Sequence, residues 1–229
     1  MQINPVVVIP VYNEADTISD EVVTIRAAGF DRILVGVDMA TTDATERTLM
    51  SSQTAFVRGV TSGYDGTVSA AVSAIPRVYP DATHVIFTDA GGKFPVEPLH
   101  DLVAAAQSGA DMVLGARILD RTHMLWHQKL GTIFVLGLIR VATGAKIHDI
   151  SPFRIISLPL LQSLAMRDRR FGWPSQMLVK CLALKCVVLE VPVTVLKRKG
   201  SSKVSGNLAN SLRAGIDMFA SLQYIRFRN

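Results

Sequence analysis

Three short polar segments, each directly after an apolar run, carry the side chains that could do chemistry in this sequence. The first covers residues 12–14, the second begins at Asp38, and the third runs from Asp89 to Lys93. Asp38 is placed to accept hydrogen bonds from a base or a sugar, and Asp89 to hold a divalent cation on a diphosphate. Lys93 offers the same diphosphate a positive charge directly. These residue types predict a pocket for a phosphorylated ligand.

Each segment also has a plainer explanation. Asn13 is a good N-cap for a helix that starts just after it, and the sequence does not decide between a cap and a ligand contact there. Asp43 and Thr45 favour the cap, because a helical pattern begins with them. A single carboxylate such as Asp89 is a weak metal site by itself. The segments therefore have to be judged by the elements that position them.

The first half of the chain alternates short apolar runs with amphipathic stretches. The runs predict buried strands over Val6–Ile9, Ile33–Val37, Ala55–Val57, His84–Thr88 and Met112–Leu114. The stretches predict helices over Asp16–Ala28, Asp43–Ser51, Gly66–Ile75 and Val96–Gln107. This alternation predicts a mostly parallel sheet, in which ligands bind beyond the carboxyl ends of the strands. The loops expected there are Pro10–Glu14, Asp38–Asp43, Gly59–Gly66 and Asp89–Pro95.

The second half continues this layout without a linker that would separate two domains. We expect one α/β domain over residues 1–229, divided into halves at 1–115 and 116–229. The segments predicted in the second half are an exposed loop 116–126, a helix His127–Thr143, a strand Pro152–Ser157, a helix Trp173–Leu184, a strand Cys186–Glu190, a basic loop Lys197–Gly206 and a closing helix Asn207–Phe227.

The formal net charge of +5 over 229 residues hides two opposite halves. Residues 1–120 hold 7 Lys+Arg against 15 Asp+Glu, whereas residues 121–229 hold 17 against 4. A basic second half predicts contact with anions, such as phosphate groups or acidic lipid headgroups. We expect no nucleic-acid partner, because aromatic residues make up only 7% and no nucleic-acid-binding motif is present. An apolar content of 49% excludes a disordered chain.

Membrane and compartment signals are few. The longest apolar stretch, Leu130–Ile139, is shorter than the roughly 20 residues that span a bilayer. The N-terminus lacks the basic start of a signal peptide, and Cys181 and Cys186 are expected to be reduced thiols, so we expect a cytoplasmic protein. For the helix His127–Thr143 we favour core packing, with peripheral contact to the inner membrane face as the alternative for this helix and the closing one.

Further segments follow the three polar turns in order: Gly115-Ala-Arg117, His148–Arg154, Phe171-Gly-Trp173, Val191-Pro-Val193 and Arg198–Gly206. Each is weak alone. Taken together, in this order and spacing, they resemble the family 2 glycosyltransferases, which have the Rossmann-like GT-A fold. Within that family the chain resembles the polyprenyl-phosphate sugar synthases, such as dolichyl-phosphate glucosyl- and mannosyltransferases. The resemblance covers nearly the whole chain.

The resemblance implies inverting transfer of a sugar from a nucleoside-diphosphate sugar to a polyprenyl phosphate or another small polar or phosphorylated acceptor. The half 1–115 would bind the nucleotide and the half 116–229 the acceptor. Asp89, Lys93 and Arg117 would be catalytic, with Asp89 also the ligand of Mg²⁺ or Mn²⁺. The implied nucleotide- and substrate-binding residues are Pro10, Tyr12, Glu14, Asp38, Gly63, Asp65, Ala90, Gly91, Trp173, Gln176, Arg198, Ser202 and Lys203.

The sequence departs from the family where acids are expected. The family's Asp-Ala-Asp metal motif ends in Gly91 here, Met39 replaces the second acid of the nucleotide loop, and Gln176 replaces a glutamate. Fewer oxygen ligands predict weaker metal binding, with Lys93 taking over part of the cation's charge. Metal-independent binding and a retained one-carboxylate Mg²⁺ site remain equally open at this point.

Two alternatives follow from the lost acids. The chain could be a glycosyltransferase-like protein with altered, metal-independent chemistry, or a non-catalytic protein that binds a nucleotide or phosphate. Product formation distinguishes these from a working transferase, whereas nucleotide binding alone does not. The closing helix could also contact a second copy of the chain, so a homo-oligomer is a further expectation.

Overall fold

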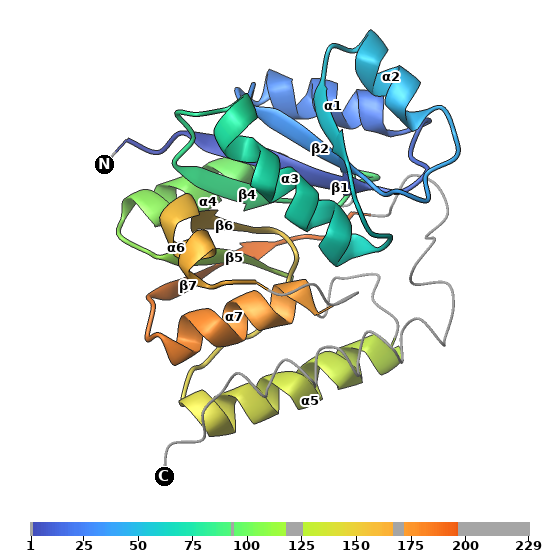
Figure 1. Cartoon of the computed structure of the whole chain (residues 1–229). Coiled ribbons are helices and arrows are strands. Elements are labelled where there is room, and N and C mark those ends of the chain that lie inside the picture. The colour runs from blue at the N-terminus through green and yellow to red at the C-terminus, as the bar shows by residue number, and fades with distance from the viewer. Residues whose placement is uncertain (1, 93, 118–125, 167–171, 197–229) are drawn as a thin grey trace.

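The computed structural model describes residues 2–92, 94–117, 126–166 and 172–196. Over these ranges seven strands form one sheet in the order β3-β2-β1-β4-β6-β5-β7, with helices on both faces (Figure 1). The strands are β1 Pro5–Val11, β2 Ile33–Val37, β3 Ala55–Arg58, β4 His84–Phe87, β5 Met112–Arg117, β6 Arg154–Ser157 and β7 Val188–Val193. The helices are α1 Ile18–Ala27, α2 Thr45–Ser51, α3 Tyr64–Val78, α4 Glu97–Gln107, α5 Trp126–Thr143, α6 Leu158–Ser163 and α7 Trp173–Ala183.

The pairing of the strands brings the carboxyl ends of all of them except β6 to one edge of the sheet. Strands β1 to β4 pair in parallel, as do β5 and β7, while β6 runs antiparallel to both of its neighbours. The expected mostly parallel α/β sheet is confirmed. The loops that follow β1, β2, β4 and β5 therefore share an edge, which is where ligands bind in such sheets.

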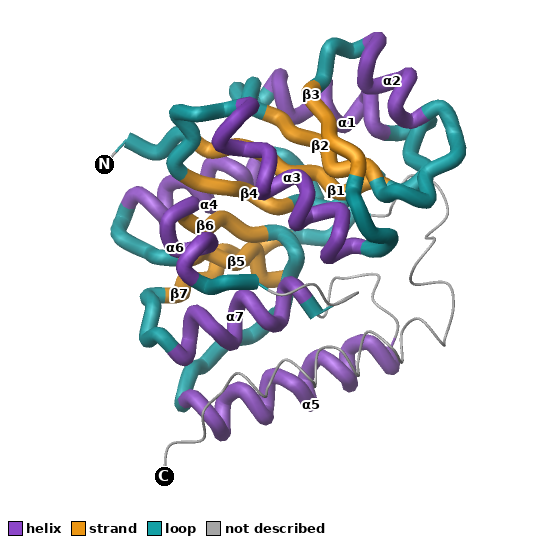
Figure 2. Tube along the Cα trace, viewed as in Figure 1, coloured by secondary structure: helices purple, strands orange, loops and turns teal. Residues whose placement is uncertain are grey.

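Two hydrophobic clusters, one on each face of the sheet, hold the layers together. In β1, Val6 and Val8 belong to the cluster that includes α3 and α7, whereas Val7 and Ile9 belong to the cluster of α1 and α4. This alternation follows from the two-residue period of a strand. Both faces are apolar because helices cover both, as the purple helices around the orange strands show (Figure 2).

Helix α3 begins earlier than the sequence predicts. Tyr64 and Asp65, expected in a loop, form its first turn, and the chain turns instead at Gly63, where φ is 107°. Gly66 lies inside the helix. A Cβ on this glycine would lie 2.7 Å from the carbonyl oxygen of Thr61, so Gly66 permits close packing and does not break the helix.

Three further outcomes concern element boundaries. Helix α6 was not expected, since its six residues are too few to show a helical period; Ser157 caps it by accepting the N–H of Leu160 at 3.4 Å. Arg117, expected in the loop 116–126, is the last residue of β5. Residues 118–125, the basic loop Lys197–Gly206 and the closing helix Asn207–Phe227 lie outside the described residues.

The expected helix His127–Thr143 is confirmed as α5. Thr132, Val135 and Ile139 are buried, in line with core packing, whereas Ile133 and Phe134 are 54% and 61% exposed. None of the helices in the described ranges has the length and hydropathy required to cross a bilayer.

Candidate functional site

Asp38 organises the loops at the carboxyl edge of β2 and β3. Its Oδ1 accepts the N–H of Ala40 at 2.8 Å and the hydroxyl of Ser62 at 3.1 Å. Its Oδ2 accepts the N–H of Gly63 at 2.6 Å and the hydroxyl of Thr67 at 3.3 Å. The carboxylate is 6% exposed, and four donors of the protein already bond to it. Asp38 therefore ties the loop after β2 to the start of α3, whatever it also contacts in a ligand.

Asn13 joins the loops after β1 and β2. Its φ is 53°, and its Oδ1 accepts the N–H groups of Thr42 at 2.8 Å and Asp43 at 3.3 Å. The N-cap position of α1 is Thr17, and no side chain caps the helix there. The capping explanation for Asn13 is therefore wrong, because the N-cap position is Thr17 and the amide oxygen of Asn13 bonds to a neighbouring loop.

Asp43 and Thr45 strengthen the same junction. Asp43 Oδ1 accepts the N–H of Thr45 at 3.0 Å, at the first residue of α2, and its Oδ2 accepts the N–H of Ala15 at 3.1 Å. Thr45 Oγ1 accepts the N–H of Glu14 at 2.9 Å. The N-cap position of α2 is Ala44, where no side chain caps the helix, so the predicted cap is wrong; Asp43 and Thr45 instead hold the first loop against the start of α2. This packing buries Glu14, which is 7% exposed, whereas Tyr12 nearby in the same loop is 42% exposed.

The turn after β4 carries Asp89, Ala90 and Gly91, the remnant of the family's metal motif. Gly91 and Gly92 both have positive φ, at 92° and 62°. The N–H of Gly91 donates to Oε2 of Glu21 in α1 at 2.8 Å, and Gly92 bonds to the same carboxylate. A carboxylate from another element thus lies beside the position where this sequence lacks an acid.

Burial raises the pKa of Glu21 to about 7, against the opposing effect of the two backbone N–H groups. The charges of Asp89 and Glu14 raise this pKa further, which places both acids near Glu21. Glu21 lies in the first turn of α1, where an acid looks like an ordinary helix-start residue. Nothing in its sequence context indicates a link to the turn after β4.

Asp65, Trp173 and Gln176 lie together where α3 meets the start of α7. They are 1%, 4% and 0% exposed, and Asp65 Oδ1 accepts the backbone N–H of Trp173 at 3.3 Å. Tyr64 is next to them; burial raises its pKa, as do the charges of Asp89 and Asp65, while Arg154 opposes the rise. The structure therefore buries all three predicted residues and joins Asp65 to the start of α7.

Arg117 is held by Asp149, which precedes β6. Its Nε and one terminal nitrogen donate to the two carboxylate oxygens, each at 2.6 Å, and its backbone N–H donates to Oδ2 at 2.9 Å. The side chains are 11% and 0% exposed. Burial alone lowers the pKa of Arg117, but the bonds to Asp149 and the charge of Asp89 raise it above the ordinary value. Arg117 is thus a fixed cation on the side of Asp89 that the second half forms.

Asp149 itself is positioned by Glu190 of β7. Glu190 Oε1 accepts the N–H groups of His148 and Asp149 at 2.9 and 3.1 Å, and its Oε2 lies 2.6 Å from His148 Nδ1. Sequence analysis did not single out Asp149 or Glu190, although Asp149 lies within a segment that resembles the family. Asp149 comes before a buried strand, and no candidate ligand loop follows that strand, so the sequence does not mark this acid as a site residue.

Arg154, the first residue of β6, is a buried cation that is 1% exposed. It donates to the carbonyl oxygens of Pro174, at 2.7 Å, and Ser151. Burial lowers its pKa to about 10, opposed by nearby Tyr64 and other groups. Arg154 therefore joins the start of α7 to the start of β6.

The remaining predicted residues fall into two groups. Pro10 lies in β1 opposite Gly36 of β2, near the edge where the loops meet. Lys93, Arg198, Ser202 and Lys203 lie outside the described residues. The basic clamp expected for phosphate oxygens therefore remains a prediction.

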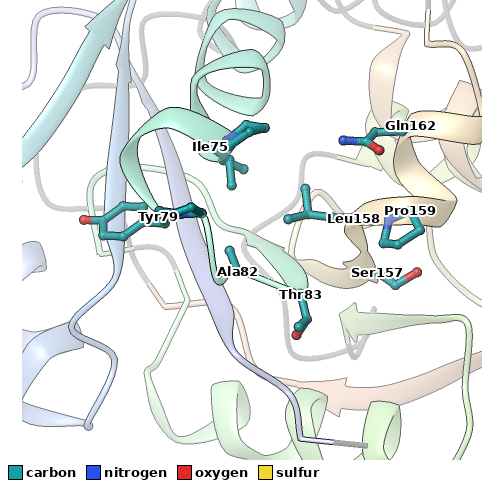
Figure 3. A pocket seen from close by; sticks show the side chains of 10 residues that line it. Ile75, Tyr79, Ala82, Thr83, Ser157, Leu158, Pro159 and Gln162 are labelled. Carbon is teal, nitrogen blue, oxygen red and sulfur yellow. The ribbon is translucent and has the colours of Figure 1, made fainter.

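A cavity of about 470 Å³ lies at the opposite edge of the sheet, near the amino end of β4 (Figure 3). Tyr79, Thr83 and Leu158 are among the residues that line it, between the end of α3 and α6. None of the predicted site residues lines this cavity. The chemistry-bearing side chains gather at the carboxyl edge, as expected for a parallel sheet.

Sequence comparison places the chain among known proteins. An uncharacterized glycosyltransferase of Mycobacterium tuberculosis is 33% identical over 215 residues, covering 93% of this chain and 95% of the relative. Glycosyltransferase AglJ of Haloferax volcanii is 26% identical over 196 residues, which are 84% of this chain and 63% of that protein. No protein-family profile matches the chain.

Among solved structures, the chain is similar to glucosyl-3-phosphoglycerate synthase from M. tuberculosis in complex with Mn²⁺, uridine diphosphate and phosphoglyceric acid. The TM-score is 0.77 at 18% identity, covering 99% of this chain and 80% of that one. A complex of the same synthase with Mn²⁺, UDP-glucose and phosphoglyceric acid gives a TM-score of 0.74 at 17% identity. These likenesses show the GT-A fold.

The fold thus defines a Rossmann-like protein of the GT-A class. The chain belongs to the glycosyltransferases.

Proposed function

We propose that this glycosyltransferase moves a sugar from a nucleoside-diphosphate sugar to a phosphorylated acceptor, either a polyprenyl phosphate or a small phosphate ester. The observation that carries the proposal is the position of Asp89. Its charge acts on Glu21, Tyr64 and Arg117, which come from both halves of the chain. Asp89 therefore lies where a donor held by the first half would meet an acceptor held by the second.

The donor nucleotide would lie over the loops after β1 and β2. Tyr12 is exposed there, and Asp38 and Asn13 hold the surrounding backbone in place. Preformed loops of this kind lower the ordering cost of binding. The family resemblance and the UDP held by the similar synthase support a nucleoside diphosphate as the ligand.

A divalent cation fits this site as a one-carboxylate ion. No group of three His, Cys, Asp or Glu side chains converges in the described part of the chain, and Asp89 is the ligand that we propose. Mg²⁺ is commonly bound by one or two carboxylates together with substrate phosphates and water. Such an ion would neutralise charge on the leaving diphosphate. The Mn²⁺ and UDP of the similar synthase support this assignment.

Arg117 is suited to the acceptor. The bidentate bond to Asp149 fixes its guanidinium at the end of β5, so it can contact an acceptor phosphate without losing side-chain freedom on binding. In the reaction an acceptor oxygen would attack the anomeric carbon while the bond from that carbon to the diphosphate breaks. An ionised acceptor phosphate would need no strong base, so stabilisation of the leaving diphosphate would be the main contribution.

The test has two stages. Purified protein is first titrated with uridine, guanosine, cytidine and thymidine diphosphates and their sugars, with Mg²⁺, with Mn²⁺ and with chelator. We expect one nucleotide to bind, and chelator to weaken its binding. The donor so identified is then incubated with a polyprenyl phosphate in vesicles and, separately, with 3-phosphoglycerate. A glycosylated product in either incubation supports the proposal and names the acceptor, whereas nucleotide binding without any product would contradict it.

A further inference from the structure

We infer that Glu21 is a positioning residue of the donor site, which holds the Gly91-Gly92 turn so that Asp89 faces the diphosphate. The inference rests on the proposed function, because it concerns how that site binds its donor. Glu21 belongs to α1 and the turn belongs to the β4–α4 connection, so the contact joins elements 70 residues apart.

The turn is one that needs an external support. Gly91 and Gly92 are both in the left-handed region, and glycine has the widest choice of backbone conformations. Because the two glycines follow one another, local steric contacts restrict the backbone direction of the segment before them only weakly. Asp89 is two residues before Gly91, so the conformation of the turn decides where its carboxylate points.

Glu21 supplies that support through hydrogen bonds to the backbone. Its carboxylate accepts the N–H of Gly91 at 2.8 Å and bonds to that of Gly92. Successive backbone N–H groups in a turn form a good anion site, and here the anion is a side chain of the protein. The contact forms at the motif position where the chain has lost an acid.

The surroundings of Glu21 disfavour the ionised form of its carboxylate. A cavity of about 250 Å³ lies between α1 and the turn, and Glu21 lines it with Asp20, Glu97 and several threonines. The charges of Asp89 and Glu14 also act on Glu21, in addition to its burial. A leucine at this position would avoid the burial of a carboxylate and the repulsion from the neighbouring acids. The carboxylate differs from leucine in forming the hydrogen bonds to the turn.

The experiment compares three variants with the wild-type protein. E21L keeps the side-chain bulk and removes the acceptor, E21Q keeps an oxygen acceptor without the charge, and D20N removes a neighbouring exposed charge that lines the same cavity. Calorimetry measures the Kd of UDP with Mn²⁺, or of whichever nucleotide the screen identifies. Thermal unfolding is followed in parallel.

We expect E21L to raise the Kd for the nucleotide with metal by about tenfold or more, as loss of hydrogen bonds to a buried group would. E21Q should restore binding to within about threefold of wild type, and D20N should match wild type. A purely structural role would lower the melting temperature of E21L and leave the Kd of the folded protein unchanged, and this outcome would overturn the inference.

Two other outcomes are also decisive. If E21L does not fold, E21D replaces it, since an arm shorter by one methylene withdraws the acceptor from the turn; wild-type affinity in E21D would overturn the inference. If the wild-type protein binds none of the nucleotides, the proposed function fails and the inference fails with it. A wild type that binds, with variants that bind equally, refutes the role of Glu21 alone.

Discussion

The two sides of the carboxyl edge hold their polar groups in different ways. On the side of β1 and β2, the carboxylates of Asp38 and Asp43 accept hydrogen bonds from backbone N–H groups and hydroxyls. On the side of β5 and β7, the carboxylate of Asp149 forms a buried ion pair with Arg117. The hydrogen-bond donors named on the first side are neutral, whereas the partner of Asp149 on the second side is a cation.

The difference has a chemical consequence for the proposed reaction. Carboxylates that bond to neutral donors favour a ligand that arrives with a cation, such as a diphosphate with Mg²⁺. A side with a fixed guanidinium favours an anionic acceptor. Replacing one hydrogen-bond partner should also cost different amounts of stability on the two sides. Loss of one member of a buried ion pair leaves an uncompensated charge behind, whereas loss of a carboxylate bonded to neutral donors does not.

The largest expected effect is on the side of the ion pair. Asp149→Asn should lower the free energy of unfolding by about 3–5 kcal/mol, since it leaves Arg117 buried without its hydrogen-bonded counter-charge. Urea denaturation measures the change. The exposed pair of Arg32 and Asp81 is a matched control, and Asp81→Asn should cost no more than about 1 kcal/mol. Equal effects of the two variants would remove the distinction between the two sides.

The next effect is on catalysis at the point where the sides meet. Asp89→Asn should reduce the rate of sugar transfer by about 100-fold or more, because it removes the charge proposed to hold the metal and its diphosphate. Folding should change little, as judged by circular dichroism. Activity that stays near the wild-type level, and stays independent of chelator, would instead favour the metal-independent alternative with Lys93.

A smaller effect is expected where the carboxylate bonds to neutral donors. Asp38→Ala removes the acceptor of Gly63, Ser62 and Thr67 and should lower the free energy of unfolding by about 1–3 kcal/mol. The Kd for the donor nucleotide should rise as the loop loosens. Asp16→Ala, at an exposed position of the same edge, serves as the control and should leave both quantities unchanged.

The smallest expected effect is a pH dependence of stability that comes from Glu21. Because the pKa of Glu21 is about 7 in the folded protein and its ordinary value is 4.5, the folded state binds more protons between these pH values. The stability this contributes is fully present below about pH 4.5 and is lost as the pH rises through 7. Relative to Glu21→Gln, the wild type should lose on the order of 1 kcal/mol over that range, after solvent screening. A difference in denaturation midpoint between wild type and Glu21→Gln that does not change with pH would contradict the raised pKa of Glu21.

Much of the fold could be predicted from local patterns. The runs Ile33–Val37 and His84–Phe87 are short, apolar and bounded by turn residues, so their strands were predicted to within one residue. Helix α3 was predicted to start too late because Gly63 and Gly66 both resemble turn glycines. Only the approach of Thr61 to Gly66 shows that the second glycine serves packing.

The candidate site divides in the same way. Asp38 and Asp89 each follow a strand, and that rule predicted them at one edge of the sheet, whereas Arg117, which ends β5, was implied only by the family resemblance. Glu21, Asp149 and Glu190 were missed because each acts on a residue far away in the chain. Their partners are 70, 32 and 42 residues away, and no spacing in the sequence marks such pairs.

The sequence by itself determined the parallel sheet, the edge where ligands bind and the resemblance to a family of transferases. These follow from the periods of strands and helices, which are local properties of the chain. The tertiary structure alone decided which acids bond to backbone N–H groups, which pair with cations and which one supports the turn of Asp89. Those choices depend on burial and on contacts between distant elements, which exist only once the chain has folded.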